Sequence, residues 1–163
     1  MIGYGNPGRI DDGLGPALAE RLARRRIPGV TVDADYQLTV EDAAAVAAHG
    51  AVVFADASVD GAEPFFFRAV EPAGAGPSFS SHSVEPAEVL GMARALFGAR
   101  TRGYALGIRG YAFDEFGERL SERAEANLAA ALRFLAPRLR TGRLETGRAA
   151  PRGGAKPGTR SET

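Results

Sequence analysis

The sequence predicts an α/β protein, a three-layer αβα sandwich in which helices cover both faces of a mostly parallel sheet. Short β-branched or aromatic runs alternate with helical patterns along the chain, as they do in βαβ units. The run at 51–56 is apolar in five consecutive positions and ends in Asp56, which is typical of a central strand covered on both sides. With 163 residues, 45% of them hydrophobic, the chain is long enough for one core and one domain.

The first half of the chain begins with a strand, a glycine-rich turn and a helix. Met1 and Ile2 alone precede Gly3, which is about half the length of a usual strand, so we expect a truncated first strand, as a start codon assigned too late would leave it. The helix follows Asp12 and ends at the arginines of 24–26, which suit the negative end of a helix dipole. We then expect a strand at 30–34, a small helix at 43–48 that is capped by an arrangement of Thr39 and Asp42, and the strand at 51–56.

In the second half we expect an edge strand at 65–70, a surface loop at 71–81, a helix, a last strand at 104–108 and a closing helix. Gly98 is placed to end the first of these helices and Ser121 to cap the second, which has Pro137 near its end. The apolar faces of the two helices are expected to be Val89, Leu90, Ala93, Leu96 and Phe97, and Leu128, Ala131, Leu132 and Leu135.

Charge divides the chain into two parts. Residues 1–140 hold 15 Lys and Arg against 18 Asp and Glu, whereas residues 141–163 hold 5 against 2. A mildly acidic body without basic clusters argues against nucleic acid as the ligand. The end of the chain is rich in Arg, Gly, Pro and Thr, so we expect a folded domain at 1–140 and a disordered basic tail at 141–163.

The composition also excludes several kinds of site. The chain has no cysteine, which rules out disulfides, a thiolate metal site and a cysteine nucleophile. It has no apolar run of about 18 residues and no leader pattern, so we expect a cytoplasmic protein that does not bind a membrane, and a monomer.

Three side chains that can bind a metal follow predicted strands or the loops after them: Asp12, Asp56 and His82. Two carboxylates and one imidazole suit zinc or nickel and leave a coordination position open for water or substrate. Each residue also has a structural interpretation. Asp11 or Asp12 would serve as a helix cap, Asp56 would accept backbone N–H groups of a neighbouring loop, and His82 would be a solvated surface histidine. His49 follows an alanine-rich helix, and we interpret it as a partner for the end of that helix.

Other familiar sites are disfavoured. Gly3, Gly5 and Gly8 have the spacing of a dinucleotide-binding loop, but Asp11 and Asp12 at the helix start would repel a pyrophosphate. No glycine-lysine-serine or glycine-lysine-threonine sequence follows, which excludes a P-loop. The serines beside His82 are not part of a G-x-S-x-G elbow, which disfavours a serine hydrolase.

Taken together, these residues form a pattern that resembles the hydrogenase maturation endopeptidases. The pattern consists of Gly3-x-Gly5-Asn6-Pro7-x-x-x-Asp11-Asp12-Gly13-x-Gly15, a strand ending in Ala55-Asp56-Ala57, and His82 in a loop before a helix. The likeness covers about residues 1–139. The segment Asp35–Asp42 is more similar to the branch that serves soluble, multimeric hydrogenases than to the membrane-bound branch.

The resemblance implies a function and a partner. Such proteases remove a short C-terminal extension from the large-subunit precursor of a nickel–iron hydrogenase once nickel is in place. It implies that Asp12, Asp56 and His82 form the site and recognise nickel carried by the substrate, so that no permanently bound cofactor is expected. Nickel held by the substrate would polarise the scissile carbonyl or activate a water. Two other hypotheses stay open: a non-catalytic protein that binds a partner and senses its metal, and an autonomous metal-dependent hydrolase.

Overall fold

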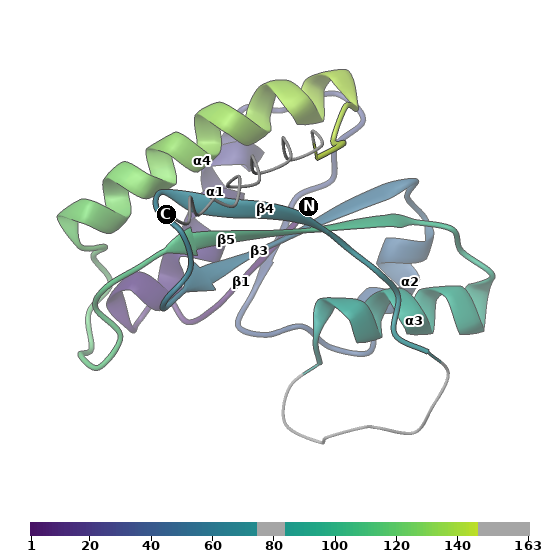
Figure 1. Ribbon diagram of the computed structural model, residues 1–163, viewed down its shortest axis with the longest axis horizontal. Helices are drawn as coiled ribbons and strands as arrows, with labels where there is room; N and C mark the ends of the chain where they lie inside the picture. Colours follow the sequence, from purple (N-terminus) through teal and green to yellow (C-terminus); the bar gives the residue numbers. More distant parts are fainter. Residues whose placement is uncertain (75–83, 147–163) are drawn as a thin grey trace, which may run out of the picture.

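The computed structural model describes residues 1–74 and 84–146, which form a five-stranded sheet between two layers of helices (Figure 1). The strands are β1 (Ile2–Tyr4), β2 (Asp33–Asp35), β3 (Ala51–Ser58), β4 (Phe65–Val70) and β5 (Arg102–Arg109). They lie in the order β2-β1-β3-β5-β4, and of these strands β4 runs antiparallel to its neighbour while the other pairings are parallel. The predicted α/β sandwich, with its edge strand at 65–70, is confirmed.

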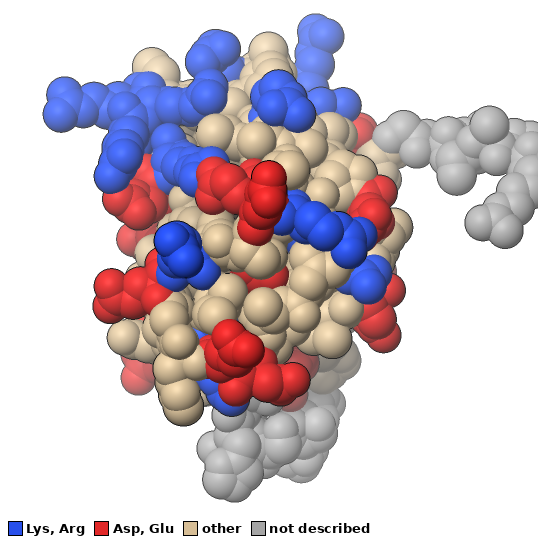
Figure 2. All heavy atoms as spheres, turned by 90° about the vertical axis from the view of Figure 1, so that its left-hand side faces the viewer, with Lys and Arg blue, Asp and Glu red and all other residues tan. Residues whose placement is uncertain are grey.

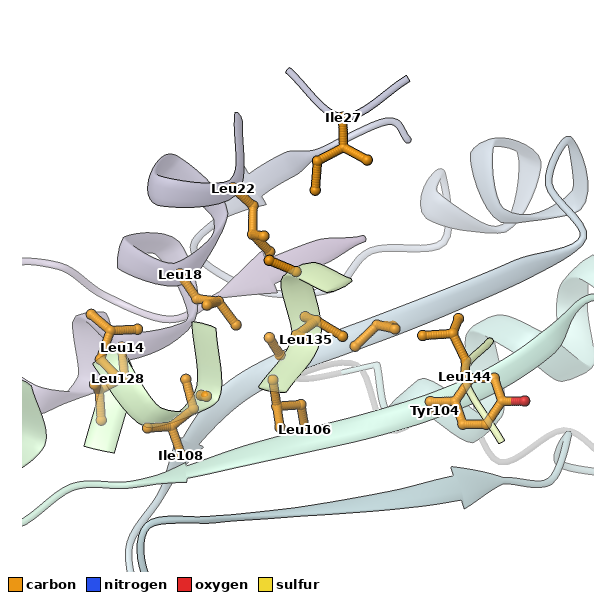
Figure 3. Packing of buried hydrophobic residues seen from close by; sticks show 14 of the residues in the cluster. Leu14, Leu18, Leu22, Ile27, Tyr104, Leu106, Ile108, Leu128, Leu135 and Leu144 are labelled. Carbon is orange, nitrogen blue, oxygen red and sulfur yellow. The ribbon is translucent and has the colours of Figure 1, made fainter. Parts of the chain in front are cut away.

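The helices are η1 (Ile10–Gly13, a 3₁₀ turn), α1 (Leu14–Arg24), α2 (Asp42–Ala47), α3 (Pro86–Phe97) and α4 (Glu122–Thr141). Helices α1 and α4 cover one face of the sheet, and α2 and α3 cover the other (Figure 1). Each face buries its own hydrophobic cluster, and the cluster under α1 and α4 is shown in Figure 3. Full burial of one leucine contributes about 1.5–3 kcal/mol, so these layers supply the main stabilisation of the domain.

Strand β3 is the centre of the sheet. It pairs with β1 on one side and β5 on the other, and its residues 52–55 are all buried. Successive side chains alternate between the faces: Val53 and Ala55 join the cluster under α1 and α4, and Val52 and Phe54 join the cluster over α2 and α3. The apolar run of β3 is therefore continuous for the predicted reason: helices cover the sheet on both faces at this strand.

The first two strands are short. Strand β1 has three residues, as the short sequence before Gly3 predicts. Strand β2 was expected at 30–34, but its ladder forms at Asp33–Asp35, where Ile2 pairs with Asp33. The apolar Val30 and Val32 instead pack against the hydrophobic cluster on the α1 side. The β-branched residues therefore pack against the core instead of forming the strand. Hydrogen bonding to the short β1 places β2 three residues after its predicted start.

Helix α3 departs from its predicted apolar face at its last turn. Val89, Leu90 and Ala93 are buried, but Leu96 and Phe97 are 71% and 56% exposed, so the prediction for these two residues was wrong. The apolar periodicity of the sequence runs through the last turn of α3, whereas the described residues that pack against α3 cover only the turns before it. Gly98 ends the helix with a φ of 64°, as predicted.

The described fold continues past residue 140. Helix α4 begins at its predicted cap, Ser121, and runs through Pro137 to Thr141. Leu144 is 4% exposed and belongs to the cluster under α1 and α4, which gives part of the expected tail a place in the core (Figure 3). Residues 147–163 lie outside the described residues. None of the described helices is long and apolar enough to cross a membrane.

Candidate active site

The topology of the sheet creates a crevice between β1 and β3. From β1 the chain passes through α1 on one face to β2, and from β2 it returns through α2 on the other face to β3, on the opposite side of β1. Helices that leave neighbouring parallel strands on opposite faces separate at the carboxyl ends of those strands, and such switch points are where open α/β sheets bind ligands. Asp12 follows β1 and Asp56 lies near the end of β3, so topology brings these two predicted residues to the same place.

A pocket of about 250 Å³ lies at this switch point. Asp12 and Asp56 both line it, as the sequence predicts for two members of the site. A larger hollow of about 500 Å³ near the end of α3 contains none of the predicted site residues. Among the described residues, the lining of the 250 Å³ pocket is Tyr4, Gly5, Asp12, Tyr36, Gln37, Leu38, Asp56, Val84 and Glu85.

Asp12 is held by the turn before it and does not cap α1. Its Oδ2 accepts a hydrogen bond from the backbone N–H of Asn6 at 2.9 Å, and the Asn6 side chain accepts one from the N–H of Gly8 at 2.9 Å. The residue that precedes α1 is Gly13, and no side chain caps that helix. The capping interpretation is therefore wrong for Asp12, whose carboxylate lines the pocket and stays fixed to the glycine-rich turn.

The glycines of this turn allow close packing of backbone on backbone. Gly5 has a φ of 139°, and a Cβ atom there would lie 2.1 Å from the carbonyl oxygen of Asp12. A Cβ on Gly15 would lie 2.3 and 2.5 Å from the carbonyl oxygens of Tyr4 and Ala55. Side chains at these positions would push α1 away from the ends of β1 and β3. The spacing that resembles a dinucleotide loop thus brings Asp12 close to Asp56.

Asp56 is placed by the alternation of β3. Like Phe54 two residues before it, it belongs to the face that α2 and α3 cover. Its Oδ1 accepts a hydrogen bond from the N–H of Ala57 at 2.7 Å, a local contact and not one from a neighbouring loop. The pKa of Asp56 is raised to about 7, mainly by burial and also by the nearby carboxylates of Asp12 and Glu85, while the hydrogen bond from Ala57 opposes the shift. A carboxyl group with this pKa can hold or release a proton near neutral pH.

Sequence reasoning missed two residues of the pocket, Tyr4 and Glu85. The pKa of Tyr4 is raised, first by burial and then by the negative charges of Asp56 and Glu85, so its hydroxyl stays neutral and can donate a hydrogen bond. Glu85 directly precedes α3, and its N–H donates to the Glu88 carboxylate at 2.7 Å. Its place before Pro86 was a usable signal, because proline favours the first turn of a helix and this helix begins at the carboxyl edge of the sheet.

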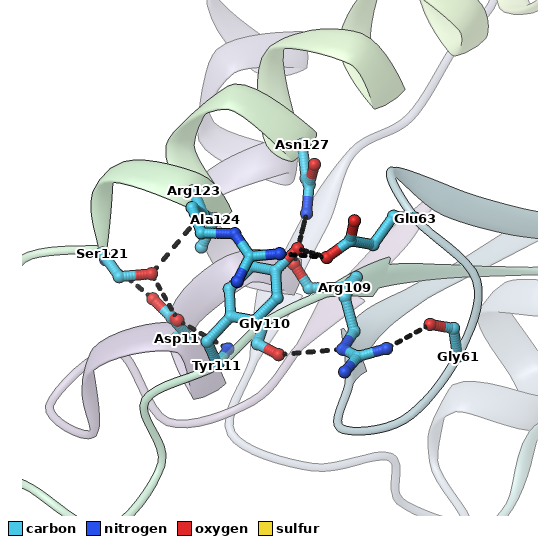
Figure 4. A network of polar contacts seen from close by, with 10 residues as sticks. All are labelled: Asp11, Gly61, Glu63, Arg109, Gly110, Tyr111, Ser121, Arg123, Ala124 and Asn127. Atoms are coloured by element: carbon cyan, nitrogen blue, oxygen red, sulfur yellow. Dashed lines mark hydrogen bonds and ion pairs between the residues drawn. The ribbon is translucent and has the colours of Figure 1, made fainter.

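Asp11 has a different role from its neighbour Asp12. Its side chain is fully buried and accepts four hydrogen bonds, from the N–H groups of Tyr111 (2.8 Å), Ala112 (3.0 Å) and Ser121 (2.8 Å) and from the Ser121 hydroxyl (2.6 Å), as Figure 4 shows in part. Burial alone would raise the pKa of Asp11, but these hydrogen bonds outweigh it and lower the pKa. Asp11 therefore fastens the segment between β5 and α4 to the start of α1.

The third predicted residue, His82, lies outside the described residues. Within residues 1–74 and 84–146, no three His, Asp or Glu side chains converge closely enough to hold a metal ion. Asp12 and Asp56 are the predicted ligands that the structure places together. His49 is at the end of α2, where its Nδ1 lies 2.8 Å from the carbonyl oxygen of Ala45, as the interpretation from sequence requires.

Comparisons with known proteins bear on the fold. No protein-family model matches this chain, and no curated protein matches it. The NiFe hydrogenase maturation protease HycI from Thermococcus kodakarensis has a similar structure, with a TM-score of 0.65 and 23% identity over 86% of this chain and 90% of that one. The hydrogenase maturating endopeptidase HybD from E. coli gives 0.63 and 21% over 86% and 91%.

A third structure, the hydrogenase 2 maturation peptidase from a Thaumarchaeota archaeon, gives a TM-score of 0.61 and 21% identity over 85% of this chain and 95% of that one. The high coverage on both sides means that these proteins share a whole domain with this chain. At identities of 21–23% the likeness is one of fold. The chain therefore has the fold of the NiFe hydrogenase maturation proteases.

Proposed function

We propose that this protein is a hydrogenase maturation endopeptidase, which removes a C-terminal extension from a nickel-loaded large-subunit precursor. The observation that carries the proposal is the meeting of Asp12 and Asp56 in one pocket at the switch point of this fold. These are two of the residues that the sequence resemblance assigns to the site, and they come from segments 44 positions apart.

In the proposed reaction Asp12 is a fixed oxygen ligand. Its Oδ2 accepts a hydrogen bond from the N–H of Asn6, and its Oδ1 would bind the nickel of the substrate. Carboxylate and imidazole groups are suitable ligands for nickel. We propose His82 as the third residue of the site, beside Asp12 and Asp56. Because the substrate brings the metal, a precursor without nickel lacks the metal contact with this pocket.

Asp56 is the proposed general base. With a pKa of about 7 it is partly ionised near neutral pH, and the positive charge of the substrate's nickel favours its carboxylate form. The carboxylate takes a proton from water while the water oxygen attacks the scissile carbonyl carbon. The C–N bond then breaks, and the proton passes to the leaving amine. Tyr4, neutral beside Asp56, would donate a hydrogen bond to the oxygen of the tetrahedral intermediate.

Intact mass spectrometry tests the proposal. Wild-type protein should shorten nickel-loaded precursor by one C-terminal peptide and leave nickel-free precursor intact. Asp56→Asn and His82→Ala should each abolish the change in mass while keeping the unfolding transition of a folded domain. A stable complex with the precursor and no change in mass would instead identify a metal-sensing binding protein. Cleavage of small amides by dialysed protein supplied with zinc would identify an autonomous hydrolase.

A further inference from the structure

Large apolar side chains meet solvent on the same edge of the sheet as the candidate site. Tyr36 and Val40 follow β2, Val59 follows β3, and Phe116 lies between β5 and α4. Their exposed fractions are 68%, 49%, 65% and 88%. These four residues are called the apolar rim below. Exposed apolar surface that collects in one part of a protein marks an interaction site more often than residues scattered over the whole surface do.

The exposed large hydrophobic residues are not spread evenly over the surface. Within the described chain, the other strongly exposed large hydrophobic residues are Leu96 and Phe97, at the far end of α3. Helix α3 starts beside the pocket with Glu85 and runs away from it. Exposed large apolar side chains are therefore concentrated on the edge of the sheet that holds the pocket, and the end of α3 supplies a control position.

Phe116 is presented by a rigid segment. The next residue, Gly117, donates its N–H to the carbonyl of Gly8 at 2.8 Å and accepts from the N–H of Ile10 at 2.9 Å. Asp11 fastens the same segment on both sides of Phe116 through its hydrogen bonds to Tyr111, Ala112 and Ser121. Because the backbone on both sides of Phe116 is already held, a partner that covers this residue has little backbone entropy to remove.

The apolar rim is wide. Its residues follow β2, β3 and β5, which together with β1 span four neighbouring strands. At a strand spacing of about 4.8 Å this is a width of roughly 14 Å, whereas one extended peptide covers about 5 Å. Tyr36 also lines the pocket, so the apolar rim reaches the candidate site at this residue. An occupant that covers the apolar rim is therefore wider than a single peptide strand.

The charge around the apolar rim is negative. The segments 5–13, 35–41, 56–63, 84–85 and 109–121 carry ten carboxylates besides the buried Asp11, against three guanidinium groups. Figure 2 looks onto this edge of the sheet and shows red carboxylates through its middle and lower parts, with blue side chains gathered above. The carboxylates belong to Asp12, Asp35, Glu41, Asp56, Asp60, Glu63, Glu85, Asp114, Glu115 and Glu118, and the guanidinium groups to Arg9, Arg109 and Arg119.

On the basis of the endopeptidase function proposed above, we propose that the apolar rim docks the folded body of the precursor, on an apolar surface bordered by Lys and Arg. Phe116 is the anchor of this contact. The width of the apolar rim requires a folded partner, its negative border selects a basic one, and its continuity with the pocket places the partner's C-terminal extension next to Asp12 and Asp56.

Binding of the large-subunit precursor to immobilised protein, measured by biolayer interferometry, tests this docking surface. Phe116→Ser should weaken the binding about 10- to 100-fold, the range expected when one phenylalanine no longer becomes buried. Leu96→Ser, which removes a side chain that is 71% exposed at the end of α3, should leave the affinity within about twofold. Raising the salt concentration should slow association, because it screens the attraction between the acidic border and a basic partner.

A synthetic peptide with the precursor's C-terminal sequence is the second arm. It lacks the folded body, so wild type and Phe116→Ser should bind it equally. Equal binding of the whole precursor to wild type and to Phe116→Ser would overturn the docking surface and leave the endopeptidase function in place. If wild-type protein neither bound the precursor nor changed its mass, the endopeptidase function would be overturned and the docking proposal with it.

Discussion

Asp11 and Asp12 are adjacent and chemically identical, and replacing each by asparagine should have opposite consequences. In Asp11→Asn the amide can keep its oxygen at the Oδ2 position, where Tyr111, Ala112 and the Ser121 hydroxyl donate. Its NH₂ group then faces the backbone N–H of Ser121, which loses its acceptor. An unpaired buried donor costs about 1–3 kcal/mol, and hydrogen bonds to a neutral oxygen are weaker than those to a carboxylate.

The expected loss for Asp11→Asn is therefore about 2–4 kcal/mol of unfolding free energy, or roughly 5–15 °C in Tm for a domain of this size. Asp12→Asn should cost less than about 1 kcal/mol, because an amide oxygen still accepts from Asn6 at the partly exposed site. Urea unfolding followed by circular dichroism measures both. In the precursor assay, Asp12→Asn should lose cleavage although it is folded. Equal stability of Asp11→Asn and wild type, or equal losses in the two variants, would refute the division of roles.

The pH dependence of the unfolding free energy, compared between wild type and Asp11→Asn, gives a further check on Asp11. Its pKa is lowered in the folded protein, so its contribution to stability is complete above the unfolded value of about 3.9 and is lost as the pH falls through the folded value. The difference in stability between wild type and Asp11→Asn should thus narrow below about pH 4. A difference that stays constant from pH 6 to pH 2 would mean that the Asp11 charge is not the source of the effect.

Three other substitutions or truncations follow from the geometry. The pKa of Asp56 is raised, so its contribution to stability is lost as the pH rises from about 4 through about 7. Asp56→Asn should therefore stabilise the protein at pH 8 by about 1–3 kcal/mol while abolishing cleavage. Cleavage by the wild-type protein should increase as the pH rises through 7. Gly15→Ala should lower Tm by roughly 5 °C or more, since its Cβ would meet two backbone carbonyl oxygens. A chain ending at residue 140 should be about 1.5–3 kcal/mol less stable than one ending at 146, because it lacks the buried Leu144; equal urea midpoints would show that this leucine contributes nothing.

Local signals in the sequence were sufficient for most of the fold. The unbroken apolar run of β3, the αL glycine at Gly98 and the Ser121 cap each depend on residues within a few positions, and the structure has all three. The register of β2 depends instead on pairing with β1, which is distant in sequence. The exposure of Leu96 depends on where the neighbouring layer ends, which helical periodicity does not contain.

The candidate site shows the same limit. Strand ends and crossover topology were enough to bring Asp12 and Asp56 together, because parallel strands place their carboxyl ends on one edge. The separation of Asp11 from Asp12 required partners 100 to 110 positions away in the chain. Tyr4 becomes part of the pocket through its shape, and a tyrosine at the end of a short strand does not by itself indicate a site, whereas the position of Glu85 before Pro86 is a local signal.

We propose that Asp12 belongs to a site that cleaves a nickel-loaded precursor. The most direct test is the intact mass of nickel-loaded and nickel-free precursor after incubation with wild-type protein and with folded Asp12→Asn. We predict loss of one C-terminal peptide with wild type and nickel-loaded precursor, and no loss in the other three combinations. Equal processing of nickel-free precursor, or full processing by Asp12→Asn, would contradict the assignment of this pocket as a nickel-recognising protease site.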